Sequence, residues 1–201
     1  MPLRLLVTDD IPESTRRDLV DAWEPIGGLE RAGAVSLKSA DPPSFIQIMG
    51  EALQWLSPLK VAAAVFLSQL AKEAATDIYK NKRKIAQALA QAGAAPLRRA
   101  TAALKRARKE SPRHPGLVIG LSIPDDYFGT ALSIRHDSDE DIACLLAAFV
   151  TKAEAIEEVL QAELRAGRPP LGRVQVIPTV AGGFRLAWMD QQFAQHQREF
   201  P

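Results

Sequence analysis

The segment from Ile78 to Lys109 contains ten basic residues and no acidic residue, and no other feature constrains this chain as much. The whole chain has 25 basic and 24 acidic residues and a formal net charge of +1. The rest of the chain therefore holds 15 basic against 24 acidic residues. We expect the basic segment to be solvated, to dock on acidic residues of the same chain, or to bind an anionic partner. The side chains expected to bind the anion are Lys80, Lys82, Arg83, Lys84, Arg98, Arg99, Lys105, Arg106 and Lys109.

Part of this segment has the pattern of an amphipathic helix that begins at Leu97 and ends near Lys109. On a helical wheel, one side carries Leu97, Ala100, Thr101 and Leu104, and the opposite arc carries Arg98, Arg99, Lys105, Arg106 and Lys109. Such a helix can follow the phosphates of a nucleic acid, contact an acidic protein, or lie on an anionic membrane surface. It can also dock internally on the helix predicted over 138–166, because eight acids lie between Asp137 and Glu163.

The N-terminal region predicts a β-α-β unit followed by a helical block. The strands are expected at Leu3–Thr8 and 32–38, around a helix that ends near Trp23. The helical block covers 42–110. Its first helix is expected to begin at the Asp41-Pro42 start signal and to have an apolar face formed by Phe45, Met49, Ala52, Leu53 and Leu56.

The C-terminal region predicts two hairpins on either side of a long helix. The apolar runs at 117–123 and 130–136 flank a turn, and those at 174–180 and 184–189 flank another. The helix over 138–166 starts at Ser138, and Gly167 closes it. The last dozen residues, rich in Gln, are expected to form a frayed tail or a short helix.

This order predicts an α+β fold with one mixed sheet of about five to six strands, in the order β-α-β, helical block, β-β-α-β-β. We expect a single domain over 1–201 with the block 42–110 as a helical excursion. The alternative is two domains, a βαβ-plus-helical domain over 1–110 and a ββαββ domain over 116–190.

The apolar stretch from Ala52 to Ala71 has Lys60 as its one charged residue. It contains a proline and is rich in alanine, so burial as a core hairpin is favoured over insertion into a membrane. The basic residues that follow it keep a second hypothesis open, in which 44–109 associates peripherally with an anionic membrane surface.

The sequence offers few catalytic or metal-binding candidates. His136 with Asp125 and Asp126 is the one acid–base group that the predicted hairpin can assemble, and capping of the following helix accounts for the acids at 137–141. A calcium loop counted from Asp137 fails, because its sixth and twelfth positions hold Ile142 and Ala148. Neither a phosphate-binding loop nor a dinucleotide fingerprint is present, so no cofactor and no metal is expected.

These patterns lead to a ranked set of functions. The first is a non-catalytic interaction or regulatory module whose basic helix engages nucleic acid or an acidic protein. Peripheral membrane association is the second, and a small enzyme centred on His136 is the third. The single cysteine and the acidic turn after the first strand predict a cytoplasmic protein, which can also be peripheral to a membrane. The frequent use of alanine and arginine hints at a bacterial source.

Overall fold

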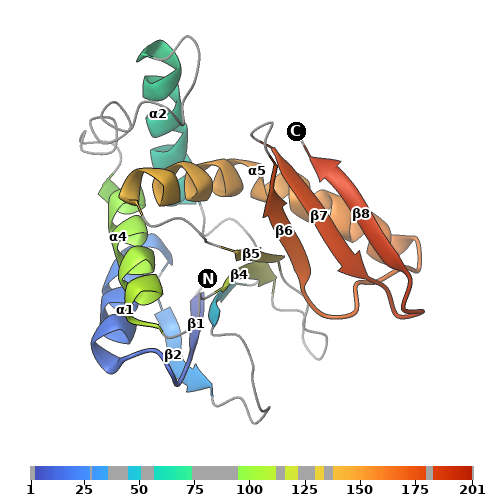
Figure 1. Cartoon of the computed structure of the whole chain (residues 1–201), viewed down its shortest axis with the longest axis horizontal. Coiled ribbons are helices and arrows are strands. Elements are labelled where there is room, and N and C mark those ends of the chain that lie inside the picture. The colour runs from blue at the N-terminus through green and yellow to red at the C-terminus, as the bar shows by residue number, and fades with distance from the viewer. Residues whose placement is uncertain are drawn as a thin grey trace.

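Eight strands and four helices make up the described part of the chain (Figure 1). The structure, a computed structural model, describes residues 3–27, 29–35, 45–50, 57–73, 95–111, 116–121, 130–133, 138–179 and 183–200. The strands are β1 Leu3–Thr8, β2 Leu29–Val35, β3 Phe45–Gly50, β4 Gly116–Leu121, β5 Thr130–Ser133, β6 Val174–Pro178, β7 Phe184–Met189 and β8 Gln195–Phe200. The helices are α1 Glu13–Gly27, α2 Ser57–Glu73, α4 Ala95–Glu110 and α5 Asp139–Arg165. The predicted α+β fold is confirmed.

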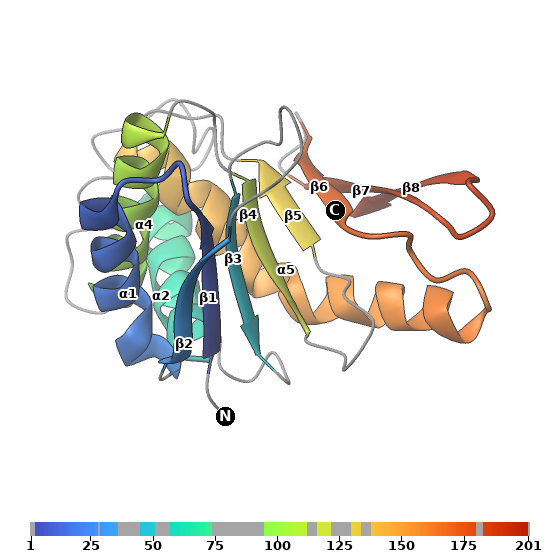
Figure 2. The same cartoon turned by 90° about the horizontal axis from the view of Figure 1, so that it is seen from below.

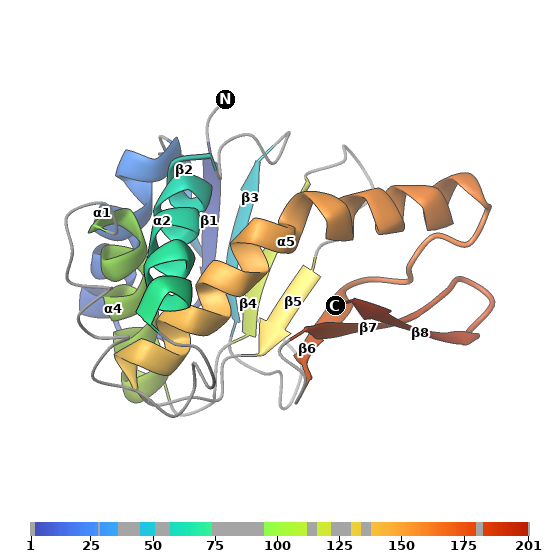
Figure 3. The same cartoon turned by 90° about the horizontal axis from the view of Figure 1, so that it is seen from above.

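All eight described strands belong to one mixed sheet with the order β2-β1-β3-β4-β5-β6-β7-β8. The pairs β1–β2, β3–β4 and β5–β6 are parallel, and each is connected through helices, as parallel neighbours require. The other neighbours are antiparallel. The four described helices lie together on one face of this sheet, which Figures 2 and 3 show from opposite sides.

The core lies between the sheet and this helical layer. Alternation along the strands sends Leu5 and Val7 of β1 toward the helices, where they pair with Ile48 and Ile46 of β3. All four side chains are buried. The helices contribute the large buried side chains Trp23, Phe66, Leu104 and Phe149 to the same core cluster.

Two predicted elements are wrong in type. Phe45–Gly50 is a strand and not the beginning of a helix. It pairs with β1 on one side and β4 on the other, and Ile46 and Ile48, two residues apart, are buried. The polar stretch Gln195–Phe200 forms β8, which pairs with β7 although it lacks an alternating apolar pattern. These two strands raise the number in the sheet above the five to six that were predicted.

The predicted block 42–110 contributes to both layers. Its described helices α2 and α4 pack against α5, and α4 also packs against α1. Its strand β3 lies inside the sheet. The division of the chain into one or two domains stays a prediction.

The long helix α5 follows its sequence signals closely. The Ser138 hydroxyl accepts a hydrogen bond from the Asp141 backbone N–H at 3.1 Å, which is the predicted cap. Gly167 has a φ of 72° and ends the helix in the left-handed region, as predicted. The apolar side chains of α5 that face the core are buried from Ile142 as far as Leu160, whereas Leu164 is exposed.

The apolar segment around Lys60 forms part of the core. Four side chains of α2 that lie on one face are buried, namely Leu59, Ala62, Ala63 and Phe66. Lys60 Nζ lies 2.5 Å from Glu154 Oε2 of α5. Among the described residues, no helix combines the length and the apolar character that crossing a membrane requires.

Replacing Phe66 by alanine tests this packing of α2. The side chain is fully buried, so Phe66→Ala should lower the free energy of unfolding by about 3–5 kcal/mol through lost burial and a cavity. Val61 on the same helix is exposed, and Val61→Ala should change the free energy of unfolding by less than about 0.5 kcal/mol. Urea denaturation followed by circular dichroism measures both. Equal effects of the two substitutions would contradict the placement of this face in the core.

Candidate functional site

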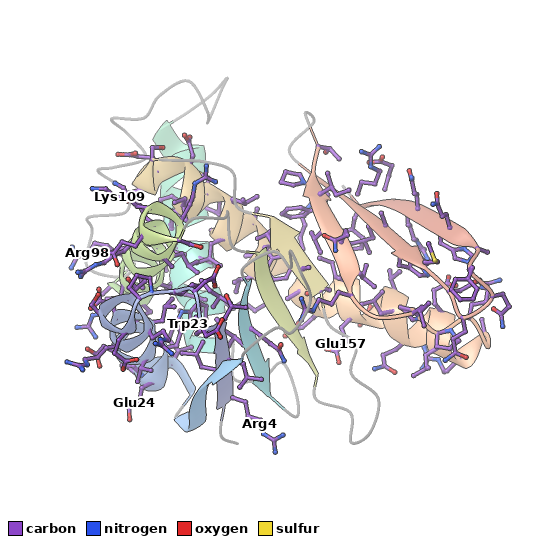
Figure 4. All side chains as sticks on the ribbon, turned by 60° about the horizontal axis from the view of Figure 1, so that its bottom comes forward. Arg4, Trp23, Glu24, Arg98, Lys109 and Glu157 are labelled. Carbon is purple, nitrogen blue, oxygen red and sulfur yellow. The ribbon has the colours of Figure 1, made fainter. Side chains whose placement is uncertain are left out.

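The basic helix α4 is amphipathic as the sequence predicts. Its inward side buries the four predicted residues Leu97, Ala100, Thr101 and Leu104, together with Ala103, Ala107 and Arg108. On the outward arc, Arg98, Arg99, Arg106 and Lys109 are exposed and Lys105 is partly exposed. Figure 4 shows Arg98 and Lys109 on the outer side of α4, pointing away from the sheet. The helix therefore presents a basic surface while its other side forms part of the core.

Two of the outward basic side chains already have acidic partners in the same chain. Lys105 Nζ lies 2.9 Å from Asp139 Oδ1 in the first turn of α5. Arg106 lies between Asp18 of α1, at 2.5 Å, and Glu110 of its own helix, at 2.9 Å. These exposed pairs each contribute little to stability, but they fix the orientation of the side chains that border the surface.

The acid Glu110 of α4 takes part in two hydrogen bonds, and the one with Thr15 joins α4 to α1. Its carboxylate accepts from the Thr15 hydroxyl of α1 and from the Arg106 guanidinium. Both bonds favour the ionised form, and the pKa of Glu110 is lowered, first by Thr15 and then by Arg106. The pKa of Arg106 is raised, first by its hydrogen bond to Glu110 and then by the charge of Asp18. Arg106 therefore stays charged at this junction.

A groove of about 520 Å³ lies between α1 and α4. Its lining combines two acids, two arginines and three alanines: Asp18, Asp21, Ala22, Arg99, Ala102, Ala103 and Arg106. Arg106 and Asp18 pair with each other across it. Arg99 and Asp21 are both exposed, so the groove presents charges of both signs to a ligand above a lining of small side chains.

Seven of the predicted site residues lie outside the described part of the chain. These are the first basic cluster, Lys80, Lys82, Arg83 and Lys84, and the acid–base group of His136, Asp125 and Asp126. Their roles stay predictions.

A polar cluster that the sequence analysis missed lies at the β7–β8 turn. Asp190 is buried, and its Oδ1 accepts hydrogen bonds from the backbone N–H groups of Gln192 and Ala194. Its Oδ2 lies 2.7 Å from His196 Nε2, and the His196 ring stacks on Trp188 with centroids 5.5 Å apart. These bonds lower the pKa of Asp190, and the largest cause is the hydrogen bond to His196. The one available signal was an Asp directly after a strand, which is typical of turns.

The single cysteine of the chain, Cys144, lies on α5. Its side chain is buried, and burial raises the pKa of the thiol to about 12, with Asp141 and Glu140 adding to the shift. A thiol in that state is a packing residue and not a nucleophile. Within the described ranges, no three His, Cys, Asp or Glu side chains gather as a possible metal site.

Comparisons with family models, with curated proteins and with solved structures find no match for this chain. The candidate site is therefore defined by its own geometry, as the basic arc of α4 and the groove between α1 and α4.

The lowered pKa of Asp190 predicts how stability changes in acid. A carboxyl whose pKa is lower in the folded than in the unfolded protein stabilises the fold above its unfolded pKa of about 4, and this contribution is lost as the pH falls through the folded value. Asp190→Asn should therefore flatten the decline of stability over that acid range. Urea unfolding at a series of pH values measures the decline.

The variant His196→Ala removes the largest cause of the shift and should flatten part of the same decline. If Asp190→Asn showed the same pH dependence as the parent chain, the hydrogen-bonded arrangement at this turn would be wrong.

Proposed function

We propose that the chain is a non-catalytic interaction module that binds an acidic segment of a partner protein at the groove between α1 and α4. The observation that carries this proposal is the pair of exposed arginines, Arg98 and Arg99, on the outward arc of α4. Lys105 and Arg106 are engaged by acids of the chain itself, whereas Arg99 borders the groove next to them. A ligand carboxylate placed there meets a guanidinium whose planar donors suit it.

The mixed charge of the groove favours an acidic protein over a nucleic acid. Asp18 and Asp21 line the same groove, and Asp21 is exposed. A continuous line of phosphates would be repelled by these carboxylates, because a nucleic acid offers no positive groups in return. A peptide can place acidic side chains at Arg99 and basic or amide groups at Asp21.

The groove lining supports binding more than catalysis. Its polar residues are aspartates and arginines, and its other three residues are Ala22, Ala102 and Ala103. Small side chains leave room for a peptide to approach the helix surfaces closely. We also place the module in the cytoplasm of a bacterium, which agrees with the single, buried Cys144 and with the use of alanine and arginine.

Reversing the charge of the two exposed arginines tests the proposal. A labelled oligo-glutamate peptide and a labelled DNA duplex serve as probes, with fluorescence anisotropy as the readout. We expect the peptide to bind more tightly than the duplex at low salt. The double variant Arg98→Glu/Arg99→Glu should weaken peptide binding by about tenfold or more, since each exposed charge contributes up to about 1 kcal/mol.

The matched control is Arg185→Glu, which reverses an exposed arginine on β7 and should leave peptide binding unchanged. Peptide binding that is undetectable at low salt, or equally weakened by the control, would contradict the proposed site. A tighter complex with the duplex, lost between about 50 and 200 mM salt, would replace the protein partner with a nucleic acid.

A further inference from the structure

The end of the molecule farthest from α1 and α4 is built from two adjoining turns (Figures 2 and 3). One is the turn at 166–173 that follows α5, and the other is the β7–β8 turn at 190–194. The Leu171 N–H donates to the Met189 carbonyl at 2.7 Å, and Pro170 forms an isolated bridge with Asp190. We call these two turns, with the last turn of α5, the distal end.

Three of the five large apolar side chains that are exposed in the described part of the chain lie at the distal end. Phe193 is 72% exposed, Leu171 is 49% exposed and Leu164 is 38% exposed. Each comes from a different one of the three segments that form the distal end. Scattered exposed apolar residues are ordinary on a protein surface, but several at one end indicate a contact site.

Phe193 also has an unfavourable backbone conformation. Its φ of 62° places it in the left-handed region, and it is the one residue other than glycine there among those described. Glycine or asparagine suits such a position, whereas a bulky aromatic residue is strained. The turn is held in this form by the Asp190 carboxylate and by the bond from the Phe193 N–H to the Asp190 carbonyl at 3.0 Å. The fold therefore keeps an aromatic ring in solvent at a position that disfavours it.

The charges around these side chains have a basic excess of one. The two turns and the end of α5, over 163–173 and 189–195, contain Arg165, Arg168 and Arg173 against Glu163 and Asp190. Both acids are engaged, because Arg168 Nε lies 2.8 Å from Glu163 Oε2 and His196 holds Asp190. Arg165 is exposed.

We propose that the distal end docks peripherally on an anionic lipid bilayer, with Phe193 inserted among the lipid headgroups. An exposed ring at the same end as two exposed leucines and the exposed Arg165 matches a surface that is negatively charged outside and apolar beneath. The site lies apart from the segment 44–109, in which Leu59, Ala62, Ala63 and Phe66 of α2 are in the core. It is also independent of the groove between α1 and α4.

Phe193→Gly separates a role in binding from a role in the fold. Glycine accepts the left-handed conformation without strain, so the variant should keep or slightly raise the melting temperature. It removes the inserted ring, and should weaken binding to vesicles of phosphatidylserine and phosphatidylcholine roughly tenfold or more. Co-sedimentation measures the binding, and vesicles of phosphatidylcholine alone should bind the parent chain less.

The matched control is Val61→Ala, since Val61 is 65% exposed but lies on α2. It should bind vesicles as the parent chain does. As a second readout, Phe193→Trp should show a blue-shifted emission on the anionic vesicles that the parent chain does not show.

The absence of binding to the anionic vesicles would overturn the proposal. So would equal binding by Phe193→Gly and the parent chain, or an equal loss with Val61→Ala. A lower melting temperature of Phe193→Gly would show that the ring serves the fold instead.

Discussion

The helical layer depends on the packing of α4 between α1 and α5. Short side chains on the inward side of α4, at Ala100, Ala103 and Ala107, let the three helices approach closely. Leu97 and Leu104 add larger buried side chains to the same core cluster. This packing determines which way the basic side chains of α4 point. Since the apolar side of α4 is fixed inward, its arginines and lysines other than the buried Arg108 form one outward arc. Lys105 and Arg106 meet acids of α5 and α1 there. Arg98 and Arg99 lie on the part of the arc that those acids do not reach.

A second constraint is the length of α5, which connects the two ends of the molecule. Its 27 residues span roughly 40 Å. It packs on α2 and α4, and its Phe149 packs edge-on against Phe184 of β7 with centroids 6.3 Å apart. Lys152 lies over the Phe200 ring of β8. The groove and the distal end are consequently held by one rigid element at opposite ends. In our proposals, one end contacts an acidic protein while the other contacts an anionic bilayer.

The elements predicted correctly are those whose signals lie within a few residues of one another. The predictions were wrong where pairing with another strand determines the structure. The amphipathic pattern of α4, the Ser138 cap and the Gly167 terminus of α5 were all read correctly, because each depends on residues within a few positions. The segment that forms β3 was predicted to be helical, because the spacing of Phe45 and Met49 fits a helix. The pairing of this segment with β1 and β4 makes it a strand, and a local pattern does not reveal that pairing. The polar strand β8 has no alternating apolar pattern and is defined by its pairing with β7.

The groove could not be predicted from the sequence, because Asp18 and Arg99 are far apart along the chain. The Asp190–His196 pair was missed because β8, which carries His196, was not predicted as a strand.

The proposed binding site requires that α4 is part of the core. Amide hydrogen exchange of the intact chain measures this directly, because amides of a packed helix open only with the cooperative unit to which they belong. We expect the amides of Ala95–Glu110 to be protected to nearly the same degree as those around Ile142 and Phe149 in α5. Exchange in α4 that is orders of magnitude faster than in α5 would show a detached basic helix. That result would contradict both the packing described here and the confinement of the binding site to one arc of the helix.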